Sequence, residues 1–303
     1  MRAAVIKGSA LAALSAFVWA TYYVFVPLID ALSPLSLFFY PSLFGALLFL
    51  VYGFYTTGRI PHPARVRDYF IPGAGYFASQ MLIILSTVSN GGVLTSTFIL
   101  LGDTIISPSI IFLLGLNRFK PRLPLLAPGM AVLVLSAAFL ATYGGFTAAK
   151  SAEGLILLVL IPPSLSLFFV YTNERIMAEG MAQILMPAFL VSSLFVAGYA
   201  AVVRQSYPLE FNGVRDLLVL ATIGVTSMFA GYMLFFAASR MTGFTLSSIL
   251  MALIPPFTLI LGVLFLGLRT SAWINALIIL AALGAGLCTV AFAEGGVLNR
   301  RTY

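Results

Sequence analysis

The chain consists of long apolar runs separated by short polar breaks. The runs predict ten membrane-spanning helices, near residues 8–28, 34–55, 70–89, 93–116, 123–143, 154–172, 182–203, 217–238, 244–267 and 272–293. A helix needs roughly 20 apolar residues to cross a bilayer, and the runs have about this length. A transmembrane barrel would instead show short segments of alternating polarity. The pattern therefore predicts an all-α membrane protein with ten transmembrane helices.

The amino-acid composition agrees with this prediction. Of the 303 residues, 61% are hydrophobic and only 8% are charged, about a third of the charged fraction of soluble domains. A soluble protein of this size could not bury so much apolar surface. We therefore expect a multi-pass protein of the cell membrane, either a plasma or an inner membrane.

The basic residues are unevenly divided between alternate loops. With a cytoplasmic N-terminus, 12 of the 16 Lys and Arg residues fall in cytoplasmic segments. The positive-inside rule thus predicts an even number of spans and two cytoplasmic termini. Asn173 and Glu174 then lie at a cytoplasmic span end, where we expect them to be solvated. The net charge of +7 is spread over short loops, which does not suggest a nucleic-acid partner.

Two segments that lie five spans apart are similar. ILLGDTIISPSIIFLLGLNRFKP in the fourth span and ILMALIPPFTLILGVLFLGLRTS in the ninth both place proline in mid-span and end with LG and an arginine. Because five is an odd number, the two halves enter the membrane from opposite sides. Inverted repeats are typical of secondary transporters, with the substrate site near the midplane. We therefore predict two inverted five-helix halves, residues 1–146 and 147–303.

Several of these features occur together in one known family. The first span and hairpin, ALAALSAFVWATYYVFVPLIDALSPLSLFFY, combine a small-residue start, a polar and aromatic cluster after Trp19, and an L-SP turn. With the proline helices ending in LG and the glycine-rich LAALGAGLCTVAF of the tenth span, the chain resembles two EamA-type repeats of the drug/metabolite transporter superfamily. It departs from that pattern at Tyr40-Pro41, where an arginine is common, and at Asn117 and Leu268-Arg269, where a glutamate is common. The resemblance implies a carrier of small metabolites, often an exporter of amino acids or similar solutes.

Asp103 is the only acidic residue in the middle of a span. It lies ten residues after Val93, hence roughly 15 Å along the helix and near the midplane of a ~30 Å hydrocarbon core. A charge there costs at least ~2.5–3.5 kcal/mol and marks a substrate or proton pathway by default. Ser96 and Ser107 share its helix face. Two interpretations stay open: these residues bind substrate or protons, or a protonated Asp103 holds neighbouring helices together.

Aromatic residues gather in the second half of the first span. Trp19 and Tyr23 share a helix face, and Tyr22 lies three residues from Trp19. They could line a cavity and contact a substrate, or form an aromatic belt at the membrane interface. Gln80 in the third span and Tyr232 in the eighth are further candidates for the cavity lining. Interhelical hydrogen bonding is the alternative role for these two residues.

Prolines in mid-span are candidates for helix breaks. Pro108 in the fourth span and Pro255-Pro256 in the ninth occupy corresponding positions of the two halves. Repeat-related helix breaks mark the binding site in many transporters, so these prolines are expected to shape or gate a cavity. Pro162-Pro163 in the sixth span is a weaker candidate, because membrane helices also tolerate proline without a functional reason.

Other function classes fit the sequence poorly. The chain has one histidine, His62, and one cysteine, Cys288, so we expect no catalytic triad, no metal site and no cofactor. It has no glycine-rich nucleotide-binding motif. We expect a secondary transporter that works by alternating access on a small solute, with proton coupling left open. The alternatives are an uncoupled facilitator or a membrane scaffold without transport. Gly284 and Gly286 would allow a close helix approach, so a monomer and a homodimer both remain open.

Overall fold

The computed structural model describes residues 2–25, 33, 35–61, 65–90, 106–113, 119–143, 152–202, 213–267, 269 and 271–297. The first half of the chain contains α1 (Arg2–Phe25), α2 (Ser36–Thr57), α3 (Arg67–Asn90), α5 (Ser107–Leu113), β1 (Phe119–Lys120) and α6 (Leu123–Tyr143). The second half contains α7 (Ala152–Glu179), α8 (Met181–Val202), α9 (Val214–Ile223), the π-helix η3 (Gly224–Gly231), α10 (Tyr232–Thr242), α11 (Phe244–Leu250), the 3-10 turn η4 (Met251–Leu253), α12 (Ile254–Leu266), α13 (Ala272–Ala293) and β2 (Gly296–Val297).

Six helices in the described part of the chain are long and apolar enough to cross a bilayer. They are Arg2–Tyr22, Ser36–Thr57, Met181–Val202, Val214–Thr242, Phe244–Leu266 and Ala272–Ala293. They coincide with the first, second and last four of the predicted spans, and α3, α6 and α7 are helices at the third, fifth and sixth. Of the fourth predicted span, the structure describes only residues 106–113. The all-α fold of a multi-pass membrane protein is thus confirmed, apart from a two-residue pairing between β1 and β2.

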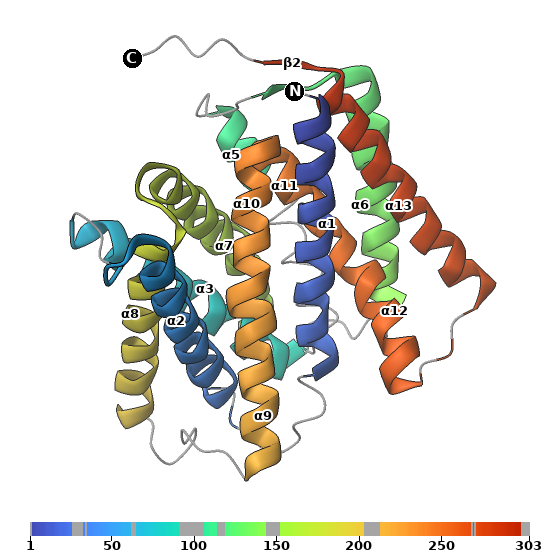
Figure 1. The fold of residues 1–303 in the computed structure, drawn as a ribbon. Helices are drawn as coiled ribbons and strands as arrows, with labels where there is room; N and C mark the ends of the chain where they lie inside the picture. Colours follow the sequence, from blue (N-terminus) through green and yellow to red (C-terminus); the bar gives the residue numbers. More distant parts are fainter. Residues whose placement is uncertain are drawn as a thin grey trace.

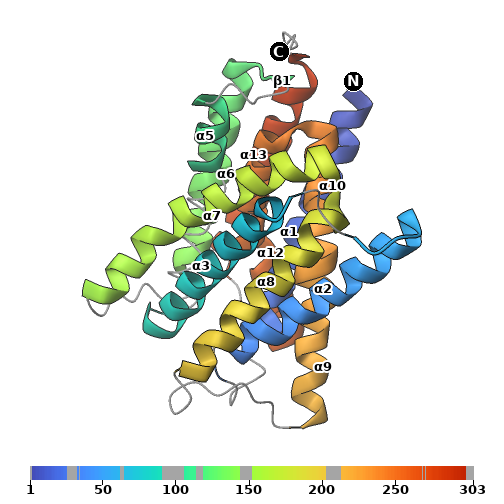
Figure 2. The same ribbon diagram turned by 90° about the vertical axis from the view of Figure 1, so that its left-hand side faces the viewer.

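The helices form a bundle with two flanking pairs (Figure 1). On one flank α6 packs against α13, and on the other α2 packs against α8. Between them, α1 runs beside the continuous helix made of α9, η3 and α10. Figure 2 shows α3 and α7 side by side on the face of the bundle that also carries α2 and α8.

The described ends of the chain meet at the same end of the bundle. The first turn of α1 and the last turn of α13 lie together there in both views (Figures 1 and 2). The antiparallel pairing of β1 with β2 brings Lys120 opposite Gly296, and Arg122 donates a hydrogen bond of 2.8 Å to Glu294. We refer to this end of the bundle as the terminal end.

Close contacts between backbones hold the α6–α13 pair. A methyl group placed on Gly284 would collide with the backbone of Leu133, and one placed on Gly129 would collide with Cys288. Because lipid tails are as apolar as leucine, membrane helices associate through tight packing and hydrogen bonds rather than through hydrophobic burial. The sequence suggested Gly284 and Gly286 for a close helix approach. Gly284 makes such an approach to α6 within the same molecule, whereas Gly286 has open space beside it.

The sixth predicted span extends beyond its expected end. Helix α7 continues to Glu179 rather than to residue 172, so Asn173 lies inside the helix and only 5% of its surface is exposed. The expectation that Asn173 is solvated is wrong, because Ser239 on α10 donates a hydrogen bond of 2.8 Å to its side-chain oxygen. Glu174 is exposed, as expected.

Candidate functional site

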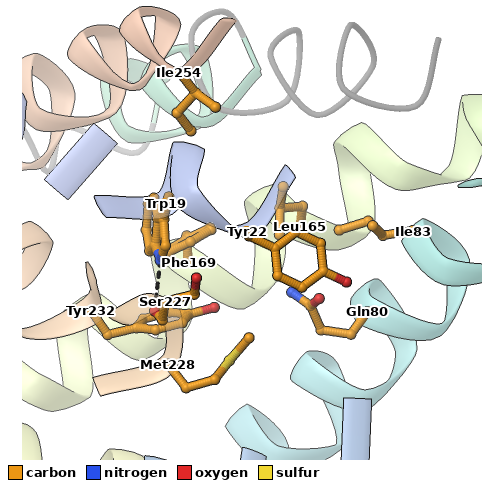
Figure 3. A pocket seen from close by; sticks show the side chains of 10 residues that line it. All are labelled: Trp19, Tyr22, Gln80, Ile83, Leu165, Phe169, Ser227, Met228, Tyr232 and Ile254. Atoms are coloured by element: carbon orange, nitrogen blue, oxygen red, sulfur yellow. Dashed lines mark hydrogen bonds between the residues drawn. The ribbon is translucent and has the colours of Figure 1, made fainter. Parts of the chain in front are cut away.

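A cavity of about 80 Å³ lies between α1, α3, α7 and the α9–η3–α10 helix. It is lined by Trp19, Tyr22, Gln80, Ile83, Leu165, Phe169, Ser227, Met228, Tyr232 and Ile254 (Figure 3). Four of these residues, Trp19, Tyr22, Gln80 and Tyr232, are those that the sequence suggested for a cavity lining. We call this space the central cavity. It is smaller than the ~300–1,000 Å³ of clefts for drug-sized ligands, so in this conformation it matches a small solute.

Trp19 is held in place by the π-helix η3. Its indole Nε1–H donates a hydrogen bond of 2.8 Å to the carbonyl of Ser227, and one turn earlier the hydroxyl of Ser15 donates one of 2.8 Å to the carbonyl of Gly231. In a π-helix each backbone hydrogen bond spans one more residue than in an α-helix, and such segments occur frequently at functional sites. The backbone carbonyls of η3 thus bind and orient α1 at the cavity.

Gly231 makes this arrangement possible. A methyl group at this position would overlap the indole of Trp19, so only glycine lets α1 approach η3 this closely. At the other end of η3, a methyl group on Gly224 would collide with Phe44 of α2. The glycines at both ends of η3 are therefore required by neighbouring helices rather than by backbone conformation.

One wall of the cavity is aromatic. The rings of Trp19 and Tyr232 lie edge to face with centroids 5.2 Å apart, and Phe169 stacks on Tyr232 at 5.9 Å. Behind this wall the buried side chains of Tyr76 and Phe189 contact Tyr232 at 6.0 and 5.4 Å. Offset and edge-to-face ring pairs stabilise each other by ~0.5–1.5 kcal/mol beyond burial. The wall therefore presents a closely packed, apolar and polarisable surface to the cavity.

Two polar groups of the cavity have no hydrogen-bond partner among the described residues. Ser227 is only 2% exposed, and its buried hydroxyl takes part in no hydrogen bond with the described residues. The structure also shows no hydrogen bond from the Gln80 amide to the described residues, and Figure 3 shows this amide beside the ring of Tyr22. A buried polar group without a partner costs ~1–3 kcal/mol. A bound solute with a donor or acceptor would offset this cost.

The ninth predicted span tightens into a 3-10 turn beside the cavity. Helix α11 ends at Leu250, the 3-10 turn η4 follows, and α12 begins at Ile254. Pro255 and Pro256 follow at once and are buried, and Ile254 lines the cavity. Proline suits the first turn of a helix, where its missing N–H is not needed. The 3-10 turn directly precedes the two prolines, whose role as a helix break or gate stays a prediction.

The other proline pair behaves differently. Pro162 and Pro163 lie within α7, which continues without interruption from Ala152 to Glu179. Pro162 is buried and Pro163 is exposed. Because α7 keeps its helical course, the structure provides no break here that would support a gating role.

Some predicted site residues cannot be placed. Asp103 and Ser96 lie outside the described residues, as do the side chains of Tyr23 and Pro108. Ser107 is buried at the start of α5, where its hydroxyl donates a hydrogen bond of 2.9 Å to Ser166 on α7. It joins these two helices and does not line the central cavity.

A polar network between the cavity and the terminal end was not predicted. Asp68 in the first turn of α3 is buried, and its Oδ1 lies 3.1 Å from Nη1 of Arg175 on α7. Arg67 lies further from the same oxygen, at 3.7 Å. No N–H points at this Asp68 oxygen with hydrogen-bond geometry, so the contact is an ion pair only. Asp68 and Arg175 both lie outside the predicted spans, where charged residues are expected, so no sequence pattern distinguished them.

Further contacts complete this network. Arg240 donates a hydrogen bond of 3.1 Å from Nη2 to the carbonyl of Ile176, near the end of α7, and the Ser239–Asn173 bond lies one turn deeper. Asn173 follows Phe169 of the cavity wall by four residues, or about 6 Å along the helix. These contacts join α3, α7 and α10 on the side of the central cavity that faces the terminal end. We call them the terminal network.

Comparisons with known proteins support the fold alone. No family model matches the chain, and no curated protein matches it. Among solved structures 23 chains match. One of these, described only as "Crystal structure of protein", superposes with a TM-score of 0.78 over 94% of this chain and 97% of its own, at 14% sequence identity. At that identity the likeness shows that the two chains share a fold and does not show a shared function.

Proposed function

We propose that this chain is a secondary transporter of small organic solutes, such as amino acids or similar metabolites, with export as the proposed direction. The observation that carries the proposal is the central cavity. Helices α1, α3 and α7 and the α9–η3–α10 helix bring an aromatic wall together with the Ser227 hydroxyl and the Gln80 amide, for which the described residues supply no hydrogen-bond partner. An apolar pocket with a few convergent polar groups is what a small-molecule site requires.

The arrangement of helices supports two inverted five-helix halves and ten spans. Exchanging the halves 1–146 and 147–303 would replace α2 by α8 and α6 by α13, and each of these pairs is in contact. In the same exchange α3 corresponds to α10, and α7 corresponds to α1. The α3–α7 contact therefore corresponds to the α10–α1 contact, and both contacts are present. Such exchange symmetry is expected of inverted repeats, which rock around a central site.

The terminal network supports alternating access. A carrier must close one side of its site while the other side is open, and the Asp68–Arg175 ion pair joins helices of opposite halves. The described basic residues Lys7, Lys120, Arg175 and Arg240 belong to elements that meet at the terminal end (Figure 1), which supports a cytoplasmic location of this end in a plasma or inner membrane. The cytoplasmic side would then be the closed one in this conformation.

The family proposal rests on the sequence. The EamA-like features of the first span, the proline helices and the tenth span suggest the drug/metabolite transporter superfamily. The shared fold with a solved structure at 14% identity adds no family name. Substrate class is therefore proposed from the cavity and the resemblance together, not from a relative.

Solute flux into proteoliposomes tests the proposal. We expect flux for at least one compound in a panel of amino acids, amines and nucleosides, measured with and without a pH gradient. Because a carboxylate at the membrane midplane is a default proton site, Asp103→Asn is expected to abolish the pH dependence while leaving residual downhill flux. Flux without any pH dependence in the parent protein would indicate an uncoupled facilitator. No flux for any compound, from protein that is folded, would favour the membrane scaffold.

A binding measurement separates transport from folding. The chain has two tryptophans, Trp19 in the cavity wall and Trp273, which is 55% exposed on α13. In a Trp273→Phe variant the fluorescence comes from Trp19 alone, so a transported solute should change it saturably. The matching Trp19→Phe variant, which keeps Trp273, should show no such change.

A further inference from the structure

A second hollow lies on the side of the bundle away from α2 and α8. It is a groove of about 370 Å³ between α1, α12 and α13, and its lining includes Ser9, Ala13, Phe257, Ile260, Ala282 and Gly286. We call it the lateral groove. Among the predicted site residues that the structure describes, Pro256 alone belongs to its lining, and the proposed solute site lies elsewhere.

Small residues keep the lateral groove open. Ala10 on α1 and both Ala282 and Gly286 on α13 are exposed, and a methyl group added to Gly286 would meet no atom within 4 Å. An apolar space of this kind does not hold ordered water. In a chain with six membrane-length helices, the medium available to fill it is the lipid itself.

One polar group points to a specific occupant. Ser9 is 7% exposed, lines the lateral groove, and its hydroxyl has no hydrogen-bond partner in the described structure. By contrast, the nearby hydroxyl of Thr289 donates to the carbonyl of Ala285. An occupant that is apolar along most of its length and carries an acceptor at the terminal end would satisfy Ser9. The ester carbonyl of a phospholipid has this character.

The length of the groove agrees with one lipid chain. On α13 its lining extends from Ile278 to Thr289, a separation of eleven residues or roughly 16 Å. Half of a ~30 Å hydrocarbon core is roughly 15 Å. The groove therefore spans about one leaflet, beginning at the terminal end.

A positive charge lies at the start of α1, beyond the Ser9 end of the groove. Arg2 precedes Ser9 by seven residues, or two turns, on the same face of α1, and it is exposed. Basic groups beside transmembrane helices attract anionic headgroups with about 1 kcal/mol per residue, or roughly fivefold in affinity. We propose that the lateral groove binds one acyl chain of an anionic phospholipid, with its ester group at Ser9 and its headgroup near Arg2.

Quenching by brominated lipids tests this site without relying on transport. Phe257→Trp places a reporter in the groove, and Leu264→Trp places one on the exposed face of the same helix, where Leu264 is 69% exposed. Both reporter variants are made in a Trp273→Phe background. The Trp273→Phe protein without a reporter gives the signal of Trp19 as the baseline. Vesicles contain phosphatidylcholine with increasing fractions of chain-brominated phosphatidylglycerol, or of brominated phosphatidylcholine as the neutral comparison.

We expect the groove reporter to be quenched by brominated phosphatidylglycerol at a several-fold lower mole fraction than the Leu264→Trp reporter. Gly286→Leu should abolish this preference by filling the groove, and Arg2→Gln should weaken it roughly fivefold. Gly198→Leu on α8, where an added methyl group also meets no atom within 4 Å, should leave it unchanged. Equal quenching of both reporters by both lipids would overturn the proposal. A second copy of the chain in the groove would exclude the brominated lipid. Quenching of the groove reporter would then weaken as the protein concentration in the vesicles rises, and this result would overturn the lipid proposal.

Discussion

The central cavity and the lateral groove are two hollows of the same bundle with opposite chemistry. The cavity is small, about 80 Å³, and combines rings from α1, α7 and α10 with an unpartnered hydroxyl and an unbonded amide. The groove is about 370 Å³, and its lining is apolar apart from Ser9 and Thr289. Volume alone would have selected the groove as the solute site. The placement of polar groups selects the cavity.

The two hollows also differ in the helices that form them. The cavity lies between α1, α3, α7 and the α9–η3–α10 helix, with Ile254 of α12 in its lining, and the terminal network joins α3, α7 and α10. The groove lies between α1, α12 and α13, beside the tightly packed α6–α13 pair. A site that must open and close requires contacts that can break, whereas a lipid site requires only a stable surface. Changes on one side of this comparison should therefore leave the other side intact.

The largest expected effect comes from Gly231→Val. Its side chain would occupy the position of the Trp19 indole, so Trp19 must leave the cavity wall and lose its hydrogen bond to Ser227. We expect solute flux to fall at least tenfold, while the lipid preference of the groove reporter persists. Gly198→Val is the matched control, because that glycine has open space on α8. Full flux in Gly231→Val would show that Trp19 is not part of the solute site.

A smaller effect is expected from Arg175→Gln, which breaks the terminal network. Asp68 is buried and would lose its main counter-charge, whereas Arg175 is partly exposed. Losing the partner of a buried charge costs ~3–5 kcal/mol, and exposure lowers this to about 2 kcal/mol here. Thermal unfolding in detergent should show a lower midpoint.

The double variant Asp68→Asn/Arg175→Gln separates charge from packing. Because it removes the uncompensated carboxylate, its midpoint should lie above that of Arg175→Gln alone. The stability losses of Asp68→Asn and Arg175→Gln are measured separately for comparison. If the loss in the double variant equals the sum of these two losses, the ion pair contributes nothing to stability, and the network does not close the terminal end electrostatically.

The smallest effect in this series is expected from Ser227→Ala. It removes the unpartnered hydroxyl from the cavity but keeps the carbonyl that accepts from Trp19. A solute that bonds this hydroxyl should bind about fivefold to tenfold more weakly, consistent with a net ~1 kcal/mol for one hydrogen bond. Trp19 fluorescence in the Trp273→Phe background measures this change. Gly286→Leu should leave that titration unchanged, and a weaker solute affinity in Gly286→Leu would show that the groove and the cavity are coupled.

The positions of the helices were predictable, and the surroundings of their side chains were only partly so. The tenth predicted span, 272–293, coincides with α13, and the fifth coincides with α6. Trp19 and Tyr22 were selected because of their spacing on one helix, and Gln80 and Tyr232 because polar groups are rare in an apolar chain. The fold brings all four to one cavity. The partners Phe169, Met228 and Ile254 could not be selected, because aromatic and aliphatic residues occur on every side of these helices. Asp103, the strongest candidate from the sequence, lies outside the described residues.

The sequence by itself determined that this is an all-α membrane protein and where most helices begin and end. The physical reason is that lipid requires every backbone polar group to be bonded within its own helix, so length and apolarity suffice to locate a span. Only the tertiary structure decided which faces meet. In lipid both the buried and the exposed faces of a helix are apolar, so no pattern along the chain marks the inner face. The π-helix at Gly224–Gly231, the burial of Asn173 and the opening beside Gly286 all depend on the neighbouring helix rather than on the local sequence.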